Sequence, residues 1–376
     1  MATVFATLLR PDDLSPLLTV QNLSVSYASR GGTVTALDKV SIDIKENELV
    51  GVVGESGCGK STLALSIIGL LPTPPARVTN GSIEFKGTDL AHLDPTHLRE
   101  FRGTQIAMIF QEPLSSLNPV YKIGDQIGEA IVIKRMRDDG HAASDSDIMQ
   151  KTHKVTAPGV SKLPRSKRKM SAELREDTIA SLKLVRIPDP DQVVDRYPFE
   201  LSGGMRQRVM IAMALSQEPA LLIADEPTTA LDVTTQAQVL KLMKELMNKV
   251  KTSILLITHD LAVACQVADR VAVMYAGDIV ETSNVYDLFS KPLHPYTQGL
   301  LSCLPTGSKR KVVLKPIPGS VPDLRTKMIG CKYVTRCQYA MKQCSETKPL
   351  LLEVEKDHQV ACYLHGEKLG NNPRNN

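Results

Sequence analysis

Apolar and polar residues alternate over much of residues 17–54, and a period of two residues is typical of half-buried β-strands. The segments LLTVQNLSVSY, VTALDKVSIDI and NELVGVVG each have this pattern, and Arg30-Gly31-Gly32 offers a tight turn between the first two. A further strand is expected in GSIEFKG, residues 81–87. This part of the chain is therefore predicted to form short strands joined by tight turns.

Later apolar segments are continuous rather than alternating, which is typical of strands buried on both faces. They are IAMIF (106–110), ALLIAD (220–225), SILLITH (253–259) and RVAVMYAG (270–277). Helical segments are expected in STLALSIIGLL (61–71), in SAELREDTIASLKLV (171–185) with Ser171 as its N-cap, and in TTQAQVLKLMKELMNKVK (234–251). Strands that alternate with helices predict a mostly parallel sheet covered by helices.

Two segments differ in texture from the rest. Residues 134–170 are polar and end in the basic stretch KLPRSKRKM, which indicates a surface insertion, with a contact to lipid headgroups or nucleic acid as the alternative. After about residue 290 the prolines predict an extended tail; they are Pro292, Pro295, Pro305, Pro316, Pro318 and Pro322.

Composition narrows the function only slightly. The 376 residues carry a net charge of +4, which is too mild to indicate nucleic acid, and there is no Trp to stack on bases. No apolar run approaches the ~20 residues that span a bilayer, and the start MATVFATLLRPDD does not have the pattern of a signal peptide. We therefore expect a cytosolic setting, where thiols stay reduced. The odd count of seven cysteines also argues against a complete disulfide framework.

The strongest motif is GESGCGKS, residues 54–61, which fits G-x-x-x-x-G-K-S/T between an apolar strand and a helix. Gly54, Gly57 and Gly59 let the backbone wrap closely around phosphates, and the helix N-terminus adds partial positive charge. Lys60 would reach the β- and γ-phosphates, and Ser61 would ligate Mg²⁺. A nucleotide site is predicted here, against the alternative of a chance glycine-rich turn.

A second motif, LLIADEPTTALD, occupies residues 221–232. Asp225 ends an apolar strand, where a carboxylate suits Mg²⁺ either directly or through water. Glu226 is adjacent and could polarise the attacking water as a general base. Without the upstream loop, the same pair could cap a helix or form a salt bridge.

A third motif, ELSGGMRQRV (200–209), places Ser202-Gly203-Gly204 before a helix and so forms a second helix start suited to phosphate. One nucleotide needs only one phosphate loop, so this segment indicates that two chains share each nucleotide. The alternative is a plain Ser N-cap with glycines in the turn.

His259 and Gln111 each follow an apolar strand. If these strands run parallel to the one that carries Asp225, their carboxyl ends meet at the edge where ligands bind. His259 would then sense or stabilise the γ-phosphate, and Gln111 would share that edge. Each residue taken alone would be interpreted as a structural histidine or a surface glutamine.

Together these residues resemble the ATPase subunits of ABC transporters. The matching segments occur in family order over residues 17–290: Tyr27 as the aromatic residue that stacks on adenine, GESGCGKST as the Walker A loop, Gln111 as the Q-loop, LSGGM as the signature, LLIADE as the Walker B strand with catalytic Glu226, Ala230-Leu231-Asp232 as the D-loop, and His259 as the switch histidine. Tyr27 could otherwise be an ordinary strand aromatic.

The resemblance implies an α/β fold. Residues 17–290 would form a P-loop ATPase core with a mostly parallel sheet, an antiparallel β subdomain and a helical subdomain at about 112–198, which contains the basic insertion 134–170. Residues 291–376 would form a small cysteine-containing C-terminal extension.

The resemblance also implies the site residues. ATP would be bound by Tyr27, Gly54, Glu55, Ser56, Gly57, Cys58, Gly59, Lys60, Ser61, Thr62, Gln111, Asp225, Ser202, Gly203 and Gly204. Mg²⁺ would be held by Ser61, Gln111 and Asp225. Lys60, Gln111, Glu226 and His259 would act in catalysis.

A narrower resemblance is to the oligopeptide/dipeptide importer branch. It is carried by MIFQEPLSSLNPV (108–120), RYPFELSGGMRQRV (196–209), HPYTQGLLSCLP (294–305) and the cysteine-containing tail. It implies a peripheral subunit at the cytoplasmic face of the membrane, whose partners are a second and often different ATPase chain, two membrane-spanning permease subunits and an extracytoplasmic binding protein. The membrane subunits would be contacted near Gln111 and EPLSSLNP.

The importer branch implies transport of di- or oligopeptides, with nickel or oligosaccharides as alternatives. The main rival from another class is a soluble ABC ATPase that acts on DNA or ribosomes. Such proteins usually have a coiled-coil insertion or two cassettes, whereas this chain has one cassette and no long heptad pattern, so no nucleic-acid partner is expected. Intact Glu226 disfavours a purely regulatory ATP-binding scaffold. Residues 134–170 depart from the branch in being longer and more basic.

Cys331, Cys337, Cys344 and Cys362 have the spacing C-x5-C-x6-C-x17-C. Four thiolates could hold Zn²⁺ or an iron–sulfur cluster, but the spacing matches neither the usual zinc knuckles nor the common ferredoxin patterns, and scattered free thiols are the alternative. His358 and His365 could serve zinc but are expected to be surface histidines. Some importers of this branch carry a 4Fe-4S cluster here, so the resemblance implies such a cluster, which would fold the tail.

Overall fold

The structure is a computed structural model that describes residues 16–111, 116–139, 170–229, 231–304, 316–326 and 328–365. Most of the basic insertion, part of EPLSSLNP, Ala230 and the first fifteen residues lie outside these ranges. No helix among the described residues is long and apolar enough to cross a membrane.

The larger sheet has eight strands in the order β11-β12-β10-β9-β3-β8-β7-β6. Its parallel strands are β3 (Leu49–Val53), β6 (Ile106–Ile109), β7 (Leu221–Asp225), β8 (Ser253–Thr258) and β9 (Arg270–Tyr275). Three antiparallel strands complete one edge, namely β10 (Asp278–Asn284), β11 (Leu352–Glu355) and β12 (His358–Val360). The predicted mostly parallel sheet is confirmed.

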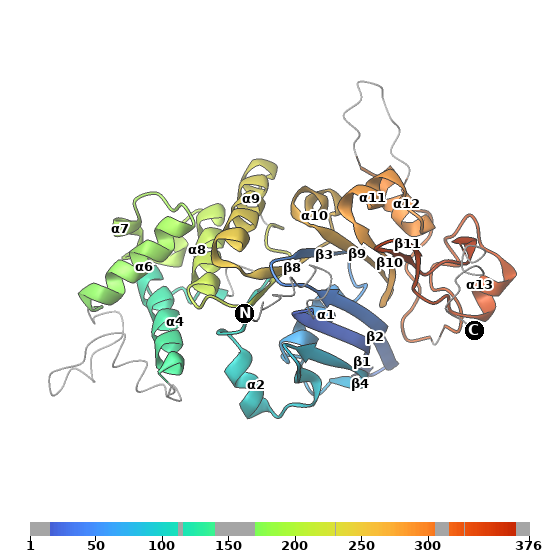
Figure 1. Cartoon of the computed structure of the whole chain (residues 1–376), viewed down its shortest axis with the longest axis horizontal. Coiled ribbons are helices and arrows are strands. Elements are labelled where there is room, and N and C mark those ends of the chain that lie inside the picture. Colours follow the sequence, from blue (N-terminus) through green and yellow to red (C-terminus); the bar gives the residue numbers. More distant parts are fainter. Residues whose placement is uncertain are drawn as a thin grey trace, which may run out of the picture.

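A smaller antiparallel sheet lies beside it, in the order β2-β1-β4-β5. Its strands are β1 (Leu18–Ser29), β2 (Gly32–Ile44), β4 (Ala76–Phe85) and β5 (Thr88–Asp89). Helix α1 (Lys60–Ile67) packs between the two sheets, with Leu63 and Ile67 fully buried in a core to which both sheets contribute (Figure 1). The predicted antiparallel subdomain is therefore also confirmed.

The helices between β6 and β7 form a separate group at one end of the molecule (Figure 1). They are α4 (Ile123–Asp138), α6 (Ala172–Leu184), α7 (Pro190–Val193) and α8 (Gly203–Leu215). Helix α6 begins at its predicted N-cap, where the Ser171 hydroxyl accepts a hydrogen bond from the Leu174 N–H. An apolar core joins this group to α9 (Val233–Val250) and to one face of the larger sheet.

Shorter helices complete the described core. They are α2 (Pro95–Phe101), α10 (Leu261–Val267) and α11 (Val285–Ser290), with the 3-10 turns η2 (Leu90–His92) and η5 (Pro198–Glu200).

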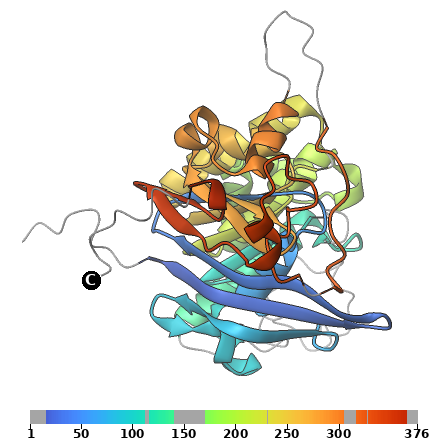
Figure 2. The same cartoon turned by 90° about the vertical axis from the view of Figure 1, so that its right-hand side faces the viewer.

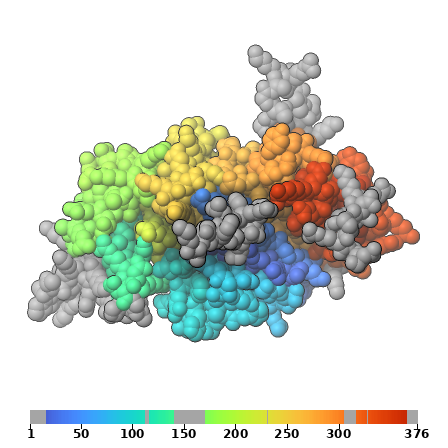
Figure 3. Space-filling view, in the orientation of Figure 1, coloured from blue at the N-terminus to red at the C-terminus, as the bar shows by residue number. Residues whose placement is uncertain are grey.

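The C-terminal extension is more ordered than its prolines predict. Pro295 stands in the first turn of helix α12 (Pro295–Ser302), where its missing N–H costs no hydrogen bond. Helix α13 (Lys342–Glu346) follows. Strand β12 pairs with β10, so the extension adds strands to one edge of the larger sheet. The prediction of an extended tail is wrong for these elements. Figure 2 shows the extension lying across the core, and Figure 3 places it at the end opposite the helical group.

The surface position predicted for His358 is wrong as well. Its side chain is fully buried, and its Nε2 lies 2.8 Å from Oε1 of the equally buried Glu281. Glu281 also accepts hydrogen bonds from the backbone N–H groups of Leu293 and His294. His365 is half-buried and its Nε2 lies 3.0 Å from the Leu293 carbonyl oxygen. Both histidines serve the packing of the extension.

Candidate functional site

The polar residues that follow the parallel strands meet at one edge of the larger sheet. Val53 of β3 pairs with Thr258 of β8, and Asp225 of β7 pairs with Ile257 of β8, so these strands end side by side. Strand β6 runs parallel to β7, with Ile109 opposite Ala224. The sequence prediction that the phosphate loop, Asp225, His259 and Gln111 share one edge is confirmed in this respect.

The loop that joins β3 to α1 depends on glycine at specific positions. A Cβ on Gly54 would lie 2.1 Å from the Met274 carbonyl oxygen, which no side chain tolerates. Gly59 has a φ of 107°, and a Cβ there would lie 2.5 Å from the Ala36 carbonyl oxygen. Gly59 is the N-cap of α1 and has no side chain to cap it, so the first N–H groups of the helix are available to a ligand. The loop has the form expected for phosphate binding.

Lys60 begins helix α1 and turns its side chain back into the loop. Its Nζ donates hydrogen bonds to the carbonyl oxygens of Gly54 at 2.8 Å and Glu55 at 3.1 Å. The residue is only 5% exposed, so the ammonium group is held inside the loop rather than in bulk water. A buried cation among backbone N–H donors favours a phosphate anion.

Asp225 is the buried carboxylate of the site. Burial raises its pKa, whereas a hydrogen bond with Ser61 and the charge of Lys60 act in the opposite direction. Its Oδ1 is buried and has no hydrogen-bond partner among the described residues. A buried carboxylate oxygen without a donor is stabilised by a cation or by a metal-bound water. Asp225 and Ser61 therefore fit Mg²⁺.

Glu226 lies at the centre of a polar cluster beside Asp225. Its Oε2 accepts hydrogen bonds from Gln111 Nε2 at 3.1 Å and from Thr229 Oγ1 at 2.8 Å. Its Oε1 lies 3.2 Å from His259 Nδ1. The backbone of Glu226 has a φ of 46°, an uncommon conformation for a residue with a side chain. Sequence analysis missed Thr229, although its place three residues after Glu226 in a turn was an available signal.

Tyr27 approaches the same loop from the smaller sheet. Its hydroxyl oxygen lies 3.4 Å from Thr62 Oγ1 in helix α1. The aromatic ring predicted to stack on a base is therefore beside the phosphate loop.

The segment Ser202-Gly203-Gly204 lies apart from this cluster. Ser202 is the N-cap of α8 and accepts a hydrogen bond from Met205 N–H at 3.3 Å. Gly204 lies next to the first turn of α9: a Cβ on Gly204 would lie 2.6 Å from Cγ2 of Thr235. Among the described residues, no hydrogen bond joins this segment to the phosphate loop. The chain does not bring its two phosphate-suited helix starts into one site by itself.

A parallel sheet with this loop, a buried carboxylate and an adjacent glutamate defines a P-loop ATPase. Residues 37–229 match the family model described as ABC transporter, and residues 280–344 match the one described as Oligopeptide/dipeptide transporter, C-terminal region. The chain belongs to the ABC transporter ATP-binding family, in the group that carries this C-terminal region, and it is an ATPase.

Relatives and solved structures agree with this assignment. The chain is 44% identical over 355 residues to the dipeptide transport ATP-binding protein DppD of Bacillus subtilis (strain 168), covering 94% of this chain and 96% of that protein. It is 44% identical over 349 residues to the oligopeptide transport ATP-binding protein OppD of the same organism, covering 93% and 88%. A dimeric ATP-binding cassette in a post-hydrolysis state, bound to ADP and Pi, superposes with a TM-score of 0.55 at 25% identity, covering 71% of this chain and 98% of that one.

The four tail cysteines lie around one enclosed cavity of about 20 Å³, although they come from separate turns of the extension. Burial, together with the neighbouring thiols, raises the pKa of Cys331 to about 12 and that of Cys362 to about 11. However, the described part of the chain contains no group of three or more His, Cys, Asp or Glu side chains placed to hold a metal ion. The thiols converge, but they are not arranged as a ligand set.

Proposed function

We propose that this chain is the ATP-hydrolysing subunit that powers import of di- or oligopeptides through a membrane ABC transporter. The observation that carries the proposal is the match of residues 280–344 to the C-terminal region of oligopeptide/dipeptide transporters, joined to an intact ATPase site. Relatives named for dipeptide and oligopeptide transport align over nearly the whole chain. Import of nickel or oligosaccharides is the alternative within the same branch.

The geometry supports a division of roles in hydrolysis. Lys60 and the first N–H groups of α1 would bind the phosphates, and Ser61 and Asp225 would hold Mg²⁺, with Gln111 as a further ligand. Glu226 would accept a proton from the attacking water, because its carboxylate is adjacent to Asp225 at the same edge. His259 lies 3.2 Å from Glu226 and would orient that carboxylate and contact the γ-phosphate. Tyr27 would stack on adenine.

Two ATPase chains would share each nucleotide. Ser202, Gly203 and Gly204 form an accessible helix start that has no contact with the chain's own phosphate loop among the described residues. A second chain would bring its equivalent segment to this loop, and this one would serve the partner's site. A heterodimer, in which the second ATPase is a different polypeptide, is the arrangement proposed here. ATP would then close the pair, and hydrolysis would reopen it.

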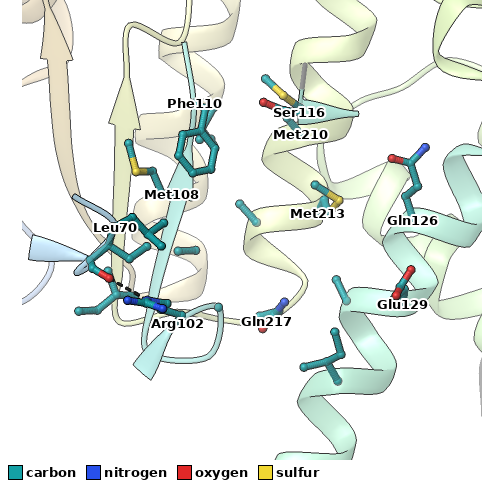
Figure 4. A pocket seen from close by; sticks show the side chains of 18 of the residues that line it. Leu70, Arg102, Met108, Phe110, Ser116, Gln126, Glu129, Met210, Met213 and Gln217 are labelled. Atoms are coloured by element: carbon teal, nitrogen blue, oxygen red, sulfur yellow. Dashed lines mark hydrogen bonds between the residues drawn. The ribbon is translucent and has the colours of Figure 1, made fainter. Parts of the chain in front are cut away.

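The contact with the membrane subunits is proposed at a groove of about 840 Å³ between β6 and helices α4 and α8 (Figure 4). Met108, Phe110, Met210 and Met213 line it, and Phe110 is 41% exposed. Flexible methionines and an exposed ring suit an amphipathic helix from another chain. The groove borders Gln111, so movement there would reach Glu226. The chain would thus sit peripherally at the cytoplasmic face of the membrane.

The four-cysteine cavity supports a second, separate proposal. The thiols of Cys331, Cys337, Cys344 and Cys362 would move together to hold a 4Fe-4S cluster or Zn²⁺ that stabilises the extension. The shared cavity favours this over scattered thiols. Iron and zinc quantified in anaerobically purified protein would test it. Bound iron near four atoms per chain supports the cluster, stoichiometric zinc replaces it with a zinc site, and protein free of both metals contradicts the proposal.

The import proposal is tested by purification of a tagged chain from solubilised membranes. Multi-span permease subunits and a second ATPase are expected to copurify in stoichiometric amounts. Recovery with ribosomes or DNA instead, without membrane subunits, would support the soluble ABC ATPase class and overturn the proposal.

A further inference from the structure

The phosphate loop contains one acidic side chain, Glu55, and its polar groups are all engaged. Its carbonyl oxygen accepts the hydrogen bond from Lys60 described above. Its backbone N–H donates to the Tyr296 hydroxyl at 3.0 Å. Its carboxylate accepts two hydrogen bonds from the guanidinium of Arg336, at 2.7 Å and 3.0 Å. The Cys58 N–H also donates to the Glu55 carbonyl oxygen, at 3.2 Å, so two of the four partners, Tyr296 and Arg336, come from the C-terminal extension.

Arg336 is held firmly enough to act as a fixed support. Its side chain is only 4% exposed, and its Nε donates to the Pro318 carbonyl oxygen at 2.8 Å. The guanidinium also lies 5.7 Å from the centre of the Tyr275 ring and 5.9 Å from that of Tyr333. The Glu55 side chain is 29% exposed, so only the arginine is largely removed from water. A bidentate pair between arginine and carboxylate is among the stronger polar contacts in proteins.

The cysteine-bearing turns determine where Arg336 lies. Its backbone N–H donates to the Tyr333 carbonyl oxygen at 3.0 Å, and the Cys331 N–H donates to the Cys344 carbonyl oxygen at 2.7 Å. Tyr296 is fully buried in α12 and contacts both Tyr275 and Tyr333. The groups that reach Glu55 are therefore part of one packed aromatic cluster that spans the core and the extension.

The charge arrangement has a direct consequence for ATP. An unpaired carboxylate at Glu55 would stand in the loop that must wrap a triphosphate, and like charges repel. Arg336 cancels that charge while it fixes the loop backbone through the Glu55 side chain. We infer that Arg336, assisted by Tyr296, is a positioning residue for the nucleotide site, so that the folded C-terminal extension sets the affinity for ATP. This inference rests on the proposed role of residues 54–62 as the ATP-binding loop.

The test measures binding of MgATP, labelled with a fluorescent N-methylanthraniloyl group, to the full chain and three variants. Arg336→Met should raise Kd about tenfold, within the usual range of coupling between sites. Adding Glu55→Gln to that variant should return Kd to within about threefold of wild type, because the uncompensated carboxylate is gone. Arg325→Met is the matched control: it removes an exposed arginine of the same extension that pairs locally with Asp323, and Kd should stay within about twofold.

Steady-state hydrolysis gives a second readout. Arg336 touches no group at the Glu226 cluster, so its loss should raise KM for ATP about tenfold while kcat changes less than about threefold. If Arg336→Met does not fold, Tyr296→Phe is measured instead. It removes only the acceptor of the Glu55 N–H and should raise Kd about threefold.

The outcomes separate this inference from the proposed function. Wild-type protein that fails to bind MgATP would overturn the assignment of the nucleotide site itself. Wild-type binding with an unchanged Kd in the Arg336→Met variant, or a failure of Glu55→Gln to restore affinity, would overturn only the role of Arg336. A lower melting temperature of the Arg336→Met variant at unchanged Kd would show that Arg336 stabilises the fold but does not position the nucleotide site.

Discussion

At the scale of single residues, the proposed chemistry depends on two carboxylates, Asp225 at the end of strand β7 and Glu226 directly after it. Asp225 is buried, and its Oδ1 has no hydrogen-bond partner in the part of the chain that the structure describes. Glu226 instead has Gln111, Thr229 and His259 within hydrogen-bonding reach. The two adjacent carboxylates thus have different environments. One suits a metal ion and the other suits proton transfer.

Glu226→Gln should reduce ATP hydrolysis by about 10²–10⁴-fold, the usual contribution of a general base. ATP binding should persist, because the amide keeps the shape of the side chain and the loop is untouched. Hydrolysis is measured by phosphate release and binding by a labelled nucleotide. Glu245→Gln, a surface change on α9 opposite Arg186, is the control. Hydrolysis at the normal rate by the Glu226 variant would refute its role as base.

Ser61→Ala should weaken the affinity of the site for Mg²⁺ rather than the binding of nucleotide itself. Removal of the hydroxyl leaves Asp225 as the nearer metal ligand, so the Mg²⁺ concentration for half-maximal hydrolysis should rise about tenfold. Nucleotide binding in excess EDTA should change much less. An unchanged Mg²⁺ requirement would exclude Ser61 from the metal site.

Sequence alone located these residues because each follows an apolar strand. Parallel pairing of β3, β6, β7 and β8 then brings their ends together without any further information. The pair of Glu55 and Arg336 was not predictable in the same way. The two residues are 281 positions apart, and no periodicity or local spacing records a contact of that kind.

At the scale of elements, we expect the start of helix α12 to lose stability in acid. His294 is its N-cap, and its Nδ1 accepts a hydrogen bond from the Tyr296 N–H at 3.0 Å. Burial lowers the pKa of His294 from 6.5 to about 4, while the charge of Glu281 acts in the opposite direction. Helix α12 carries Tyr296, whose hydroxyl accepts the hydrogen bond from the Glu55 N–H, so a loss of helix α12 would also affect the phosphate loop.

The sign of the pH effect follows from this pKa. Between pH 6.5 and pH 4 the unfolded chain binds a proton at His294 that the folded chain does not, so stability falls as the pH is lowered through this range. The full loss is about 3 kcal/mol. His294→Asn keeps a capping group without the titration and should flatten the melting temperature between these pH values. A melting temperature of the His294→Asn variant that still falls with the wild-type slope would contradict the assignment.

The elements of the extension escaped sequence analysis for physical reasons. Proline usually interrupts a helix, yet Pro295 occupies the first turn of α12, the helical position that tolerates it. Strand β12 has only three residues and exists because β10 offers an unpaired edge. His358 was expected at the surface because a lone histidine in a polar segment gives no sign of a buried glutamate partner.

At the scale of the whole molecule, the helical group and the extension lie at opposite ends of the core (Figure 3). The groove that borders Gln111 and the pair of Arg336 and Glu55 therefore reach the nucleotide site from different sides. Membrane subunits would act through the groove, whereas the extension would tune the affinity of the loop. The two influences should be separable by mutation.

Phe110→Ser is expected to reduce the yield of copurified permease subunits several-fold, because it removes the exposed ring that lines the groove. The melting temperature of the isolated chain should fall little, since the ring is already 41% exposed. Tyr286→Ser, at an exposed aromatic residue on α11 away from the groove, is the matched control. Full recovery of permease subunits with the Phe110 variant would show that they do not dock at this groove.

The central claim is that ATP hydrolysis by this chain drives peptide import. The most direct measurement is ATP hydrolysis by the complete transporter in proteoliposomes, with the binding protein and candidate cargoes added in turn. Di- or oligopeptides should stimulate hydrolysis several-fold, and Glu226→Gln in this chain should abolish that stimulation. Stimulation by nickel or an oligosaccharide with no response to peptides would contradict the account.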